Sequence, residues 1–113
     1  MSNDAKNFFD KYQDDAKKRK ELAPDLVQGF SGLSGKVMVD GSLTLREKEM
    51  VALGIAVAVR CIPCIKLHVK AALAAGASKQ DIMEAVSVSV LMAGGPAYTH
   101  IAVVTDTLEE LGA

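Results

Sequence analysis

The run Met50–Val59 contains ten residues without a charged or hydrogen-bonding side chain. Thr44 and Glu47 precede it with the spacing of a capping box, so we expect one helix from about Leu45 to Val59. A helix that is apolar on almost every side is usually buried on more than one of them. Because the chain has only 113 residues, a partner subunit is the expected cover for part of this helix.

Proline, glycine and capping residues divide the rest of the chain into further helices. Ser31–Gly41 contains three glycines, so at least part of it is expected to be a connector. The expected helices cover residues 2–22, 24 to about 30, 61–75, 78–93 and 97–111. The side chains expected to point inward from the fifth helix are Ile82, Val86, Val90 and Leu91, and the methionines expected in the core are Met38, Met50, Met83 and Met92.

The composition agrees with an all-α fold. Half of the residues are hydrophobic, only five are aromatic, and strand-like alternation is scarce. We expect a single domain over residues 1–113, with N-terminal helices and a connector in 1–42 and a redox core in 43–111.

Net charge and hydropathy limit the kinds of binding partner and the cellular location expected for this protein. A net charge of −1 gives no electrostatic reason to expect nucleic acid or an anionic membrane as a partner. The N-terminus lacks the pattern of a signal peptide, and the apolar runs are too short to span a membrane. These features predict a soluble, cytoplasmic protein.

The two cysteines, Cys61 and Cys64, stand as a CxxC pair at an expected helix start, and His68 follows one turn later. A helix N-terminus favours a thiolate, because its free N–H groups and positive dipole end stabilise negative charge. His68 lies on the same helical face as Cys64 and could exchange a proton with it. In the cytoplasm such a pair is more often catalytic, redox-sensing or metal-binding than a permanent cross-link.

Glu49 is the candidate carboxylate of this site. It lies on the preceding helix, twelve residues before Cys61, among apolar neighbours. If the two helices pack as a hairpin, Glu49 approaches the Cys64–His68 pair, and a partly buried carboxylate suits a proton relay. Glu47 is the rival, although the capping box already accounts for it.

Simpler interpretations stand beside each candidate. Both cysteines could be small buried apolar residues, His68 could be structural, and Glu49 could be a solvated first-turn residue. A metal site is disfavoured because the chain offers two Cys and two His without zinc-finger spacing. Tyr98 and His100 follow the Gly94-Gly95-Pro96 break, and they are weak candidates for the mouth of a substrate pocket.

The pattern Glu49–x11–Cys61-x-x-Cys64–x3–His68 resembles the core of the carboxymuconolactone decarboxylase superfamily, specifically its alkylhydroperoxidase D-like branch. The resemblance covers about Leu43 to Leu111. One departure is Ile62-Pro63 between the cysteines, where the peroxidase branch often has a histidine. The resemblance implies an all-α bundle assembled as a homotrimer or homohexamer.

The same resemblance implies reduction of peroxides or disulfides. Cys64 would be the attacking thiolate, Cys61 the proton donor and resolving thiol, and His68 with Glu49 the relay. No cofactor is required, and a dihydrolipoyl, thioredoxin-like or small thiol would return the electrons. Two alternatives stay open, namely a redox-sensing oligomer that is not an enzyme and a non-redox lyase or isomerase on the same fold.

Overall fold

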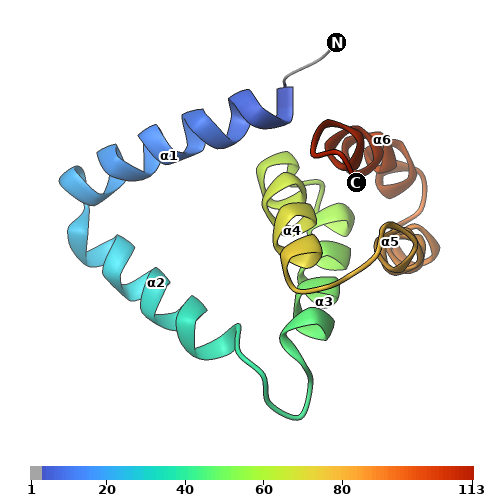
Figure 1. The fold of residues 1–113 in the computed structure, drawn as a ribbon, viewed down its shortest axis with the longest axis horizontal. Helices are drawn as coiled ribbons and strands as arrows, with labels where there is room; N and C mark the ends of the chain where they lie inside the picture. The colour runs from blue at the N-terminus through green and yellow to red at the C-terminus, as the bar shows by residue number, and fades with distance from the viewer. Residues whose placement is uncertain (1–3) are drawn as a thin grey trace.

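A computed structural model describes residues 4–113 and contains six helices over that range (Figure 1). They are α1 (Asp4–Leu22), α2 (Pro24–Val37), α3 (Leu45–Ala58), α4 (Ile62–Ala74), α5 (Lys79–Ala93) and α6 (Gly95–Glu110). The expectation of an all-α fold is therefore confirmed. The expected start of the first helix at Ser2 lies outside the described residues.

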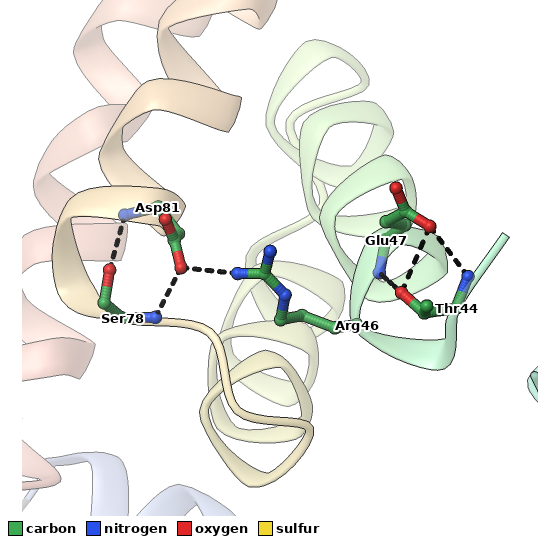
Figure 2. Close-up of polar contacts among 5 residues, drawn as sticks. All are labelled: Thr44, Arg46, Glu47, Ser78 and Asp81. Atoms are coloured by element: carbon green, nitrogen blue, oxygen red, sulfur yellow. Dashed lines mark hydrogen bonds and ion pairs between the residues drawn. The ribbon is translucent and has the colours of Figure 1, made fainter.

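Capping boxes begin α3 and α5, as the sequence predicts. The Thr44 hydroxyl accepts from the Glu47 N–H at 3.1 Å, and the Glu47 carboxylate accepts from the Thr44 N–H at 2.8 Å. Ser78 and Asp81 repeat this exchange at 3.0 and 2.9 Å. Arg46 also binds the Asp81 carboxylate at 2.6 Å, so an ion pair joins the first turns of the two helices (Figure 2).

The core lies among α3, α4, α5 and α6, which we call the α3–α6 bundle. Each of these helices contributes aliphatic side chains that are almost fully removed from solvent. The largest of them are Leu53, Val57, Ile65, Val69, Ile82, Val86 and Val104. At about 1.5–3 kcal/mol for each buried side chain of this size, this cluster is the main source of the fold's stability.

Three helices end with the same hydrogen-bond pattern, the Schellman motif, which requires a residue of positive φ after the helix. Gly76 and Gly112 fill this position after α4 and α6, with φ of 98° and 78°. Arg60 fills it after α3, with φ of 60°. Its N–H donates to the Val57 carbonyl at 3.1 Å, and the N–H of the next residue donates to the Ala56 carbonyl at 3.0 Å. The chain thus reverses between α3 and α4.

The arm formed by α1 and α2 differs from the bundle. α2 buries no residue and stands apart from the α3–α6 bundle (Figure 1). It also runs further than expected, to Val37, so Gly32 and Gly35 are helical and the connector shrinks to residues 38–44. The helix continues because Leu26, Phe30, Leu33 and Val37 recur at helical spacing, a signal that the glycines obscured.

Two other expectations about individual residues were wrong. Leu91 and Met92 were expected in the core, but they are 81% and 79% exposed, because the inward face of α5 ends at Ser89 and Val90. The break before α6 also reduces to Gly94, at φ of 75°, since Gly95 and Pro96 already belong to α6. Among the described residues, every helix is too short or too polar to cross a membrane.

Candidate active site

The cysteine pair lies where α4 begins. Cys61 is the N-cap residue, and Cys64 belongs to the first turn of the helix. The two form a disulfide with Cα atoms 5.2 Å apart, and both residues are half-buried. The Cys61 sulfur also accepts a hydrogen bond from the Cys64 N–H at 3.2 Å. The start of α4 therefore directs an N–H that has no partner within the helix at the Cys61 sulfur. When the disulfide is reduced, this N–H stabilises negative charge on that sulfur.

Pro63 is tolerated between the cysteines because of this position. It lies at the second residue of α4, where no intrahelical hydrogen bond uses its missing N–H. The sequence predicted this placement, and the proline fixes the backbone of the turn that carries both sulfurs.

Glu49 and His68 meet across the α3–α4 hairpin. The Glu49 Oε1 lies 2.7 Å from the His68 Nδ1, although the two residues are 19 positions apart. The Glu49 side chain is 9% exposed and that of His68 33%. A carboxylate at this distance accepts a hydrogen bond from an N–H on Nδ1, and in that tautomer of a neutral imidazole Nε2 is the acceptor. Nε2 has no hydrogen-bond partner among the described residues, so it is available to a thiol or a substrate.

Glu47, the rival carboxylate, serves a different purpose. The Thr44 backbone N–H, helped by the Thr44 hydroxyl, lowers the pKa of Glu47 below its usual value of 4.5. A carboxylate stabilised as an anion by a helix cap is a poor proton acceptor near neutral pH. The structure therefore favours Glu49, because that side chain is buried and directed at the histidine.

α1 lies beside the helix start that carries the cysteines, a position that was not predicted from the sequence. Lys66 and Lys70 of α4 place their ammonium groups 5.9 and 4.5 Å from the ring centres of Phe8 and Phe9. These cation–π contacts join α1 to α4, and α1 also packs against α6. The contacts between α1 and α4 leave a hollow of about 360 Å³ against Pro63, lined by Phe8, Lys11, Tyr12, Asp15 and Arg19. The signal available in the sequence was the aromatic face of the first helix, but nothing indicated which helix it would contact.

The weak candidates Tyr98 and His100 lie on the first turns of α6. Tyr98 is 66% exposed, and His100 binds the carbonyl of Pro96 through Nδ1 at 2.8 Å. In the described part of the chain neither shares a hydrogen bond with the cysteines, His68 or Glu49, so their place in a substrate pocket stays a prediction. Within the same residues, no three His, Cys, Asp or Glu side chains gather as a metal site would require.

Comparison with known proteins gives one family and several relatives. Residues 24–107 match the model of the carboxymuconolactone decarboxylase family. An uncharacterised protein of the cox locus in Paracoccus denitrificans is 39% identical over 82 residues, which cover 73% of this chain and 74% of the relative. An uncharacterised protein of Cupriavidus necator is 30% identical over 76 residues, 67% of each chain.

Solved structures agree with the fold in detail. A carboxymuconolactone decarboxylase family protein from Legionella pneumophila superposes with a TM-score of 0.92 at 28% identity, over 99% of this chain and 100% of its own. A protein of the same family from Thermotoga maritima, suggested to be involved in an antioxidative response, gives a TM-score of 0.82 at 25% identity. That match covers 91% of this chain and 88% of the Thermotoga chain.

Proposed function

The chain belongs to the carboxymuconolactone decarboxylase family, and from this premise we propose that it is a thiol-dependent oxidoreductase. Its substrates are peroxides or disulfides, and its reactive group is the Cys61–Cys64 pair. The proposal rests on two features that occur together at the start of α4. A disulfide-forming CxxC pair caps α4, and His68, one turn after Cys64, is bound at 2.7 Å to the buried carboxylate of Glu49.

The cycle begins with both cysteines reduced. The Cys64 thiolate attacks one oxygen of a peroxide, the O–O bond breaks, and an alcohol or water leaves with one proton. Cys64 is then a sulfenic acid, which Cys61 attacks to form the disulfide and release water. The net change oxidises two thiols and reduces one peroxide. With a disulfide substrate the same pair exchanges through a mixed disulfide.

The Glu49–His68 pair supplies and accepts the protons. His68 Nε2 takes the proton from the Cys64 thiol and later gives it to the departing oxygen, while Glu49 holds the ring through Nδ1. Because the Glu49 carboxylate is nearly inaccessible to water, it fixes one orientation of the imidazole. The hollow beside Pro63 is the proposed place where a substrate or donor reaches the sulfurs.

A thiol donor completes the cycle by reducing the disulfide. A dihydrolipoyl group, a thioredoxin-like protein or a small thiol has the required chemistry, and no cofactor takes part. We place the cycle in the cytoplasm, since a dithiol must be reduced again to turn over and that compartment keeps thiols reduced. The relative suggested to be involved in an antioxidative response supports this class of reaction.

The test is peroxide-dependent and disulfide-dependent turnover with a dithiol donor, in the native chain and in Cys64→Ser. Loss of turnover in Cys64→Ser is expected, because the proposed attacking sulfur is gone and Cys61 alone cannot close the disulfide. Cys61→Ser should still consume one peroxide per chain and stop at a sulfenic acid, which a dimedone adduct reveals by mass. Turnover that survives Cys64→Ser or alkylation of both thiols would contradict the mechanism.

The two single variants also separate the roles of the cysteines. The hydrogen bond from the Cys64 N–H to the Cys61 sulfur would equally stabilise a thiolate on Cys61. If Cys61→Ser loses its single turnover while Cys64→Ser forms the dimedone adduct, the attacking sulfur is Cys61. Ser87→Ala, an exposed change on α5, is the matched control for expression and handling.

A further inference from the structure

The hollow beside Pro63 combines an apolar wall with a positive charge. It is lined mainly by apolar atoms, and Phe8, Tyr12 and Arg19 all contribute to its surface. The ring centres of Phe8 and Tyr12 are 5.9 Å apart and the rings are inclined by only 28°, so they form a nearly flat wall. The guanidinium carbon of Arg19 lies 5.0 Å from the centre of the Tyr12 ring. An apolar surface and a cation therefore lie next to each other in one hollow.

The ion pair on this face of α1 leaves Arg19 uncompensated. Asp15 lies four residues after Lys11 and four before Arg19, so its carboxylate is within reach of either cation. It binds the Lys11 ammonium, with both carboxylate oxygens at 3.1 Å. Among the side chains that the structure describes, residues 7–113, no carboxylate lies within ion-pair distance of Arg19. The charges of Lys11 and Asp15 cancel, whereas that of Arg19 is available to a ligand.

The hollow lies at the end of α4 that carries the sulfurs. Lys70, near the end of α4, contacts Phe9 of α1. Pro63, in the first turn of α4, instead shares the hollow with Tyr12 and Arg19. The two helices therefore run in opposite directions where they meet, and α1 passes the start of α4 (Figure 1). Because Pro63 stands between the two cysteines, a molecule in the hollow lies beside the turn that holds both sulfurs.

The surroundings of this turn are positively charged, although the net charge of the whole chain is −1. Arg60 directly precedes Cys61, is exposed, and forms no ion pair with any side chain in the described part of the chain. It keeps its cation at a φ of 60°, a conformation that glycine adopts without strain. The positive end of the α4 dipole adds to the same field. Anions are therefore attracted to the start of α4.

We propose that the hollow selects organic substrates that carry a carboxylate on an apolar body. This inference rests on the proposed function, since the selected molecules are the peroxides and disulfides that the cysteine pair reduces. The apolar body lies on the rings of Phe8 and Tyr12. The carboxylate binds Arg19, because the paired N–H groups of a guanidinium match its two oxygens. The hollow, at about 360 Å³, is in the size range of small-molecule sites and is far larger than hydrogen peroxide.

The selection changes which substrate binds and leaves the reaction as it is. With a carboxylated hydroperoxide the O–O bond breaks, two thiols become one disulfide, and the products are an alcohol and water. With a carboxylated aromatic disulfide, two thiols become one disulfide and two aromatic thiols leave. The carboxylate takes no part in either bond change. Arg19 should therefore affect KM much more than kcat.

The first experiment compares two chromogenic disulfides in their reaction with the reduced chain. Dithiobis(nitrobenzoate) carries a carboxylate on each ring and dithiodipyridine carries none, and stopped flow follows the released aromatic thiol. Arg19→Gln should lower the rate ratio of the carboxylated to the neutral disulfide about threefold to tenfold. Lys17→Gln is the matched control, because Lys17 lies two residues before Arg19 and so on the opposite face of α1. An unchanged ratio in Arg19→Gln, or an equal loss in Lys17→Gln, would overturn the inference.

The second experiment measures peroxide turnover with a dithiol donor. The substrates are hydrogen peroxide, cumene hydroperoxide and the ring-carboxylated derivative of cumene hydroperoxide. The native chain should give its highest kcat/KM with the carboxylated derivative and its lowest with hydrogen peroxide. Arg19→Gln should raise the KM of the carboxylated derivative to that of cumene hydroperoxide. Equal turnover of both organic peroxides would reject the selection and leave the proposed function standing. Absence of turnover with all three would reject the proposed function.

The third experiment tests binding without any redox step, so its outcome does not depend on the proposed function. Isopropylbenzoate has the apolar body and the carboxylate but neither an O–O nor an S–S bond, and it is titrated into the disulfide form. Amide shifts in an NMR spectrum should change in α1 between Phe8 and Arg19 and in the first turn of α4. Isopropylbenzamide, which is neutral, and the Arg19→Gln variant should each show a Kd about threefold to tenfold higher. Shifts confined to other helices, or equal affinity for the amide, would overturn the inference.

Discussion

Replacing Arg60 by glycine should stabilise the protein. Arg60 has φ of 60°, while Gly76 and Gly112 occupy the same position of the same motif. A left-handed conformation costs an L-residue about 1–2 kcal/mol, and glycine returns about 0.5–1 kcal/mol of this through the greater freedom of its unfolded chain. The expected net gain for Arg60→Gly is therefore about 0.5–1 kcal/mol. For a chain of this size this corresponds to a rise of about 2–5 °C in Tm.

The assay is thermal and urea unfolding at one fixed protein concentration. About 0.5 M salt screens the attraction between Arg60 and the α3 C-terminus. Gly76→Ala is the matched control with the opposite sign. No heavy atom lies within 4 Å of its added Cβ, so its expected loss of about 1 kcal/mol reports the backbone alone. If Arg60→Gly melts at or below the native temperature while Gly76→Ala is destabilised, the reasoning from backbone strain is wrong.

Three further changes test other parts of the structure. Ser89→Ala removes a buried hydroxyl that donates to a carbonyl of α3 at 2.7 Å, so the free energy of unfolding should fall by about 1 kcal/mol in urea titrations. The capping boxes lower the pKa of Asp81 and Glu47 below 3.8 and 4.5. Their contribution is therefore complete above about pH 5 and is lost as the pH falls through the lowered values, and a double variant with Asn and Gln there should show a flatter acid limb. Glu49→Gln should lower peroxide turnover by about 10²–10⁴-fold while leaving the disulfide able to form, because it removes the carboxylate that orients His68.

The elements of the α3–α6 bundle could be predicted from local signals. Thr44 and Ser78 are bonded to the third residue after them, and local hydrogen bonds of this kind depend on a few neighbouring side chains. The Glu49–His68 contact was also predictable, since helical spacing and a short hairpin bring the two side chains to one interface. Both cases rest on geometry within or between adjacent helices.

The features that escaped prediction depend on distant or absent partners. Leu91 is an exception, because it follows the buried Ile82 by nine residues and so lies on the opposite side of α5, which helical periodicity alone shows. The continuation of α2 through Gly32 was not predicted, because helix propensity disfavours glycine inside a helix and α2 buries no residue that would mark it as packed. The contact of Phe9 with Lys70 depends on the path of the whole α1–α2 arm.

The Asp81 carboxylate has a consequence for local opening. It accepts hydrogen bonds from the backbone N–H of Ser78 and from the Arg46 side chain. One carboxylate is therefore bound by the first turns of two helices (Figure 2). Neither helix can fray at that end without releasing a bond that the other uses. Amide protons in the first turns of α3 and α5 should therefore exchange with solvent at linked rates, as one cooperative unit that spans 35 positions of sequence.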